Sequence, residues 1–122
     1  MSVAGVVRDA GIGEQRRWPR YQISVPVIVL IRREDKTVLA NGRGTELNEG
    51  GLAVFVSAEL AIDEEVEISF TPPYNNTPIE VRCAVRNRQG YIYGLEFLEG
   101  KAEDAQRVEQ IRNVLRAIGL PK

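Results

Sequence analysis

The feature that most constrains the fold is a two-residue alternation along the chain, which is clearest at 25–31 and recurs at 52–57, 65–70 and 79–86. Two further strands are expected at 37–46, which is weakly apolar and contains two glycines, and at 91–97, which follows a Gln-Gly turn. A period of two places successive side chains on opposite faces of a β-strand. The period then changes, because Val108, Ile111, Leu115 and Ile118 are spaced like one face of a helix. We therefore expect an all-β fold, a small six-stranded antiparallel β-barrel with a C-terminal α-helix.

Prolines and glycines predict irregularities within this barrel. Pro26 cannot donate to a β-ladder, so it indicates a strand edge or a bulge. Gly42 and Gly44 predict twist or a bulge in the second strand. Polar segments at 34–36 and 48–51 predict turns between strands.

The length and the termini indicate one domain. The 122 residues are enough for a single domain with its own core. Residues 1–14 are glycine-dotted and polar, and we expect a flexible N-terminal arm there, followed by the domain at 15–118. No cationic leader and no run of 18 apolar residues is present, so we expect a cytoplasmic protein without membrane insertion.

The composition argues against an enzyme, a cofactor and a nucleic-acid partner. There is no histidine, the commonest general base at neutral pH, and the single cysteine, Cys83, lies on the apolar face of a predicted strand. The densest acidic run, 63–65, has the character of a solvated turn and not of a metal site. With 17 acidic and 16 basic residues the chain lacks the broad positive charge that nucleic acid requires.

A cluster of arginines precedes the first predicted strand. Arg16, Arg17 and Arg20 surround Trp18 and Pro19, the tryptophan being the only one in the chain. Arginine binds phosphate through paired charged hydrogen bonds and stacks on flat rings, so Arg16 and Arg20 could clasp an anionic aromatic ligand. The alternative is that these are solvated charges, with the tryptophan tucked against the barrel.

A polar turn after the second strand offers complementary chemistry. Glu46 and Asn48 are two residues apart, so they project from the same face of an extended segment. A carboxylate accepts from an N–H edge such as that of guanine, and an amide donates and accepts. Gly51 leaves room for a ligand near the backbone. The alternative is that this segment is only a turn.

Taken in this order, the two segments resemble the motifs of the PilZ family. Residues 16–20 match R-x-x-x-R, and residues 46–51 align with [D/N]-x-S-x-x-G, with Glu46 in place of Asp or Asn and Asn48 in place of Ser. The segment 93–97, YGLEF, is similar to the late strand of that family.

The resemblance implies a PilZ-like split barrel at 15–118 that binds the bacterial second messenger cyclic di-GMP and signals to an unidentified downstream protein. The ligand-binding residues that it implies are Arg16, Arg17, Arg20, Glu46, Asn48 and Gly51. The alternative is a protein-interaction module of the same fold that does not bind nucleotide. Partner contacts would then come from Trp18, Tyr74 and Tyr91, although ordinary packing is favoured for Tyr91.

Overall fold

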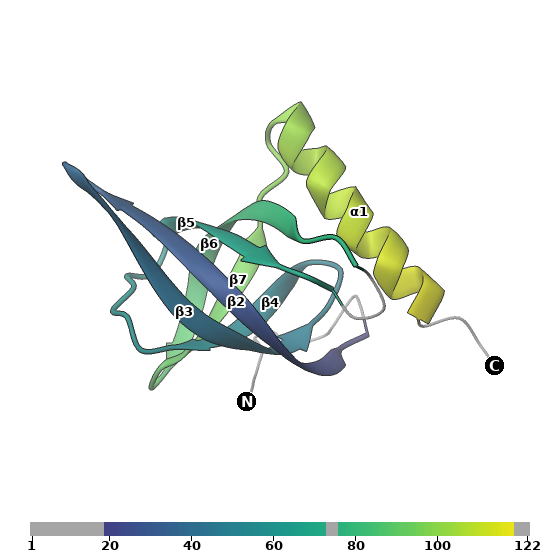
Figure 1. Ribbon diagram of the computed structural model, residues 1–122, viewed down its shortest axis with the longest axis horizontal. Helices are drawn as coiled ribbons and strands as arrows, with labels where there is room; N and C mark the ends of the chain where they lie inside the picture. The colour runs from purple at the N-terminus through teal and green to yellow at the C-terminus, as the bar shows by residue number, and fades with distance from the viewer. Residues whose placement is uncertain (1–18, 73–75, 119–122) are drawn as a thin grey trace.

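The computed structural model describes residues 19–72 and 76–118, which form a closed antiparallel barrel followed by one helix (Figure 1). The predicted arm at 1–14 therefore lies outside the described residues. The strands are β2 (Tyr21–Arg33), β3 (Lys36–Leu47), β4 (Gly51–Val56), β5 (Glu65–Phe70), β6 (Ile79–Gln89) and β7 (Ile92–Phe97), and the helix is α1 (Ala102–Ile118). The predicted all-β barrel with a C-terminal helix is confirmed.

The strands are arranged around the barrel in the order β2-β3-β4-β7-β6-β5, and β2 closes it by pairing with both β3 and β5. The alternation read from the sequence points one side chain in two into the barrel, and Val27, Val29 and Ile31 of β2 are all buried there. β2 and β3 form a long hairpin whose tip projects beyond the other strands in Figure 1.

Register shifts occur at Gly44 and close to Pro26, whereas Gly42 pairs in regular register. The register of β3 against β4 shifts between Gly44 and Glu46, which confirms a bulge in that strand. Pro26 lies just before the part of β2 that pairs with β5, and the β2–β3 register shifts shortly before it. Proline has no N–H to donate, and it is tolerated at position 26 because no β5 residue pairs with it.

Helix α1 packs on β6, and it begins earlier than its apolar stripe indicates. Val108, Ile111 and Leu115 are buried in the core cluster as predicted. One turn before Val108, Asp104 is only 1% exposed, and its carboxylate accepts a hydrogen bond from Arg82 of β6 at 2.7 Å. The helix therefore continues its buried face with a charged residue, which a hydrophobic pattern does not reveal.

The outer surface of the barrel differs between its two halves. The outward side chains of β5 and β6 are rich in ion pairs, including Arg82 with Glu65 and Arg32 of β2 with Glu67. The outward positions of β2, β3, β4 and β7 carry instead most of the exposed large apolar side chains, among them Ile28, Leu39, Phe55 and Ile92. In the described part of the chain, no helix is both long and apolar enough to cross a membrane.

Candidate functional site

The structure brings Arg20 and Glu46, one residue from each sequence motif, into contact. Arg20 directly precedes β2, and Glu46 lies opposite Gln22 in the β2–β3 ladder. The Arg20 Nη1 donates to Glu46 Oε2 at 3.3 Å, and the two side chains are 21% and 22% exposed. Antiparallel pairing therefore joins two charges that are 26 positions apart in the chain. Arg16, Arg17 and Trp18 lie outside the described residues.

Asn48 shapes the turn that follows β3. Its Oδ1 accepts hydrogen bonds from the N–H of Gly50 at 2.6 Å and of Gly51 at 2.9 Å, and its own N–H donates to the Gly51 carbonyl at 3.0 Å. An asparagine whose oxygen caps the following N–H groups forms a local turn without help from other elements. The side-chain oxygen is thus used inside the turn, and the side-chain NH₂ is the group that can face a ligand.

Gly51 is required by the contact between β4 and β7. A Cβ added at this position would overlap the carbonyl oxygen of Leu95 and stand 3.3 Å from the Cα of Glu96. The space that the sequence suggests for a ligand is therefore filled by the backbone of the neighbouring strand. Glycine permits this close approach because it has no side chain.

Helix α1 supports the same turn from the other side. The Arg112 Nε donates to the Glu49 carbonyl at 2.9 Å, and its guanidinium pairs with Glu99. Arg116 pairs with the Glu49 carboxylate at 3.1 Å. The turn at 48–51 is therefore held between β7 and the second half of α1.

Two outward-facing side chains that the motifs do not include lie on the same face of the barrel. Arg43 of β3 stands opposite Phe55 of β4, and the adjacent ladder position on this face joins Glu46 to Ala53. Phe55 is 50% exposed. Neither residue belongs to a sequence motif, but Phe55 carries a signal of its own, because it is a large aromatic residue on the outward-facing side of an alternating strand.

Tyr91, for which packing was favoured, is in fact 46% exposed. The guanidinium of Arg88 lies 5.6 Å from the centre of its ring. That expectation of ordinary packing is wrong, since Tyr91 lies in the turn between β6 and β7 with nearly half of its surface exposed. Trp18 and Tyr74, the other aromatic residues considered for a partner, lie outside the described residues.

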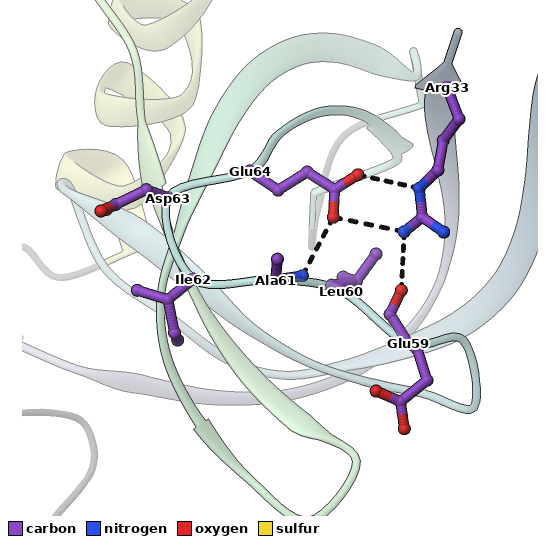
Figure 2. Close-up of a pocket in the computed structure, with 7 residues that line it drawn as sticks. All are labelled: Arg33, Glu59, Leu60, Ala61, Ile62, Asp63 and Glu64. Carbon is purple, nitrogen blue, oxygen red and sulfur yellow. Dashed lines mark hydrogen bonds and ion pairs between the residues drawn. The ribbon is translucent and has the colours of Figure 1, made fainter.

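A separate depression of about 570 Å³ lies at the β4–β5 loop, at the opposite end of β2 from Arg20. Figure 2 shows that its polar groups contact one another: Arg33 donates to the Glu64 carboxylate and to the Glu59 carbonyl. Burial raises the pKa of Glu64, but hydrogen bonds from the Ala61 N–H and from Arg33 outweigh it and hold the pKa below its usual value. The acidic run at 63–65 is therefore solvated only at its two outer members, and Glu64 serves to fix the loop.

Neither the single cysteine nor the acidic side chains of the described residues form a reactive or metal-binding site. Cys83 is fully buried, as expected, and burial followed by the charge of Glu96 raises the pKa of its thiol far above the usual value. Residues 19–72 and 76–118 contain no group of three or more Cys, Asp or Glu side chains placed to hold a metal ion.

Comparison with known proteins identifies relatives of this barrel. The family model "PilZ domain" matches residues 14–113. The PilZ domain of CeSA from a cellulose-synthesizing bacterium superposes with a TM-score of 0.64 at 16% identity, covering 80% of this chain and 98% of that one. No curated protein matches the sequence significantly.

Two longer proteins contain a similar barrel. MotI/DgrA of Bacillus subtilis, an inhibitor of motility, gives a TM-score of 0.58 at 17% identity, and the match covers 88% of this chain and 54% of MotI. MrkH of K. pneumoniae, in its complex with c-di-GMP, gives a TM-score of 0.58 at 18% identity, and the match covers 88% of this chain and 55% of MrkH. This chain therefore spans about half the length of MotI and MrkH, and at these identities the likeness is one of fold.

Proposed function

Because the chain belongs to the PilZ domain family, we propose that it is a cyclic di-GMP receptor that acts as an effector module in bacterial second-messenger signalling. The observation that carries this proposal is the contact between Arg20 and Glu46, which joins the two sequence motifs at one place on the barrel surface. MrkH, a structural relative, forms a complex with c-di-GMP. The proposed ligand-binding residues are Arg16, Arg17, Arg20, Glu46, Asn48 and Gly51.

In this proposal the ligand replaces the ion pair between Arg20 and Glu46. A partly exposed pair such as this stabilises the free protein by at most about 1 kcal/mol. A phosphate held by Arg20, and guanine N–H groups held by Glu46, would each form charged hydrogen bonds worth roughly 1.5–3 kcal/mol. The exchange is therefore favourable, and it makes both side chains available to the ligand at once.

The proposed output is a changed surface at the same end of the barrel. Arg16 and Arg17 precede Arg20 by only a few positions in the chain, so their guanidinium groups would add positive charge for the same ligand. The surface that carries the bound nucleotide would then be recognised by a downstream protein in the cytoplasm. The protein acts here by binding and carries out no catalysis.

Isothermal titration calorimetry with cyclic di-GMP tests this function. We expect binding by the whole chain and a loss of about tenfold to a hundredfold in affinity for Arg20→Ala and Arg16→Ala. Arg32→Ala is the matched control, because Arg32 is exposed at the other end of β2. Equal affinity in Arg20→Ala and in the unchanged protein would refute the clasp.

The contacts inside the second motif favour a competing function, a protein-interaction module that does not bind nucleotide. The Asn48 oxygen is used by the turn, and the space at Gly51 is filled by Leu95. Both residues are thus explained without a ligand. A thermal shift separates the two functions, since cyclic di-GMP raises the melting temperature of a receptor and leaves that of the interaction module unchanged.

A further inference from the structure

The contact of Arg20 with Glu46 provides for only part of a cyclic dinucleotide, which carries two phosphates and two purines. We infer that Arg43 and Phe55 form a second half-site that binds the other guanine and its phosphate. This inference rests on the proposed function, and it adds two residues that lie outside both sequence motifs.

The ladder places this half-site beside the first. Arg43 is opposite Pro26 on β2 and Phe55 on β4, while Glu46 is opposite Gln22 and Ala53. Phe55 is two residues from Ala53 on the same face of β4, a separation of about 7 Å along the strand. Adjacent positions at this spacing can hold the two halves of one small ligand.

The guanidinium of Arg43 is directed toward the first half-site. Its Nη1 donates to the Ser24 Oγ at 3.2 Å. Ser24 lies on β2 between Pro26 and Gln22, and Gln22 is the residue paired with Glu46. The side chain of Arg43 therefore extends from its own ladder position toward that of Glu46.

Arg43 also has the charge that the ligand needs. It is exposed, and no carboxylate among residues 19–72 and 76–118 pairs with it. Most other arginines of that part of the chain have acidic partners, namely Arg20, Arg32, Arg33, Arg82, Arg86, Arg88, Arg112 and Arg116. The pair Arg20–Glu46 is neutral as a unit, so Arg43 adds net positive charge on this face for a doubly negative ligand. Its planar guanidinium can bind phosphate or guanine O6 and N7 through two hydrogen bonds.

Phe55 supplies a surface for a purine ring. Half of its side chain is exposed, and its cross-strand neighbour Ile92 is 43% exposed. The adjacent positions toward Glu46 are the small residues Ala53 and Gly94, which pair with each other. The position above Gly94 is covered by the side chain of Asn87 of β6, so a flat ring beside Phe55 would lie on the Ala53 side, where β4 carries only a methyl group. Stacking of a base on an aromatic side chain is a large and sequence-tolerant contribution to nucleotide binding.

The test is calorimetry with cyclic di-GMP on the whole chain and on Arg43→Gln, Arg43→Lys, Phe55→Ala and Phe55→Tyr. We expect Arg43→Gln to weaken binding about tenfold to a hundredfold, and Phe55→Ala about fivefold to a hundredfold. The affinity of Arg43→Lys should lie between those of Arg43→Gln and the unchanged protein, because lysine keeps the charge but lacks the planar guanidinium. Phe55→Tyr should retain the affinity of the unchanged protein, because it keeps the aromatic ring. Both residues are exposed, so the melting temperatures of the variants should change little.

Two matched controls make the result specific. Arg107 likewise has no acidic partner in the described residues, but it lies on α1 beside Glu80 and Ser69, so Arg107→Gln should leave affinity unchanged. Ile62 is 53% exposed on the β4–β5 loop, and Ile62→Ala controls for the loss of an exposed apolar group.

The outcomes separate this inference from the function on which it rests. If the unchanged protein gives no binding heat and no thermal shift, the proposed function fails, and the half-site fails with it. If the unchanged protein binds, and only Arg20→Ala weakens the affinity, the receptor function stands and the half-site is overturned. In that case the exposed apolar face at Phe55 and Ile92 would serve protein contacts and not the nucleotide.

Discussion

Substitution of Gly51 by alanine tests whether the last glycine of the second motif serves packing or ligand binding. The added methyl would overlap the Leu95 carbonyl oxygen, and the other atoms near it also belong to the β7 backbone. A backbone atom in a ladder cannot rotate away as the end of a side chain can. Relief therefore requires β4 and β7 to separate locally, which weakens the pairing that closes this side of the barrel.

The magnitude follows from two opposing effects. Overpacking costs typically 1–3 kcal/mol, and a clash with backbone belongs near the upper end of that range. Alanine offsets about 0.4–1 kcal/mol of this by reducing the freedom of the unfolded chain. We therefore expect Gly51→Ala to lower the free energy of unfolding by about 2 kcal/mol. For a domain of this size the melting temperature should fall by roughly 5–12 °C.

Urea denaturation without ligand, followed by circular dichroism, measures this effect as a shift of the midpoint at constant slope. Gly100→Ala is the matched control, because no atom lies within 4 Å of a Cβ at that position, and it should be neutral or slightly stabilising. If Gly51→Ala unfolds at the same urea concentration as the unchanged protein but loses cyclic di-GMP, the glycine serves the ligand and the packing argument is refuted.

Two further predictions concern buried groups. Asp104→Ala removes a carboxylate that is 1% exposed and bonded to Arg82, and it should lower the free energy of unfolding by about 1–3 kcal/mol, since Arg82 keeps its pair with Glu65. Glu109→Ala, which removes an exposed pair with Arg116, should cost less than about 0.5 kcal/mol in the same urea titration, and equal losses would contradict the role given to burial. Burial raises the pKa of the Cys83 thiol, so at pH 8 the native protein should react with Ellman's reagent only as it unfolds. Immediate stoichiometric labelling of a protein with a native circular dichroism spectrum would show that the thiol is accessible.

The sequence by itself determined the elements of this fold and their order. Alternation with a period of two is a local property, because successive side chains of any strand must point in opposite directions. It predicted six strands and their inward faces, and the three-and-four spacing after Val108 predicted the helix. Pro26 and Gly44 likewise indicated register shifts close to them, because the missing N–H of proline and the wide backbone freedom of glycine are intrinsic to the residue.

Only the tertiary structure decided which of these residues meet. The contact of Arg20 with Glu46 depends on the register of β2 against β3, and the overlap at Gly51 depends on the distance between β4 and β7. The burial of Asp104 likewise depends on Arg82, which lies 22 positions earlier in the chain. No local pattern encodes these contacts, because each arises between strands or elements that pairing brings together. The sequence thus specified which side chains could bind a ligand, whereas the geometry of the barrel decided which of them share one face and which are used to hold the fold.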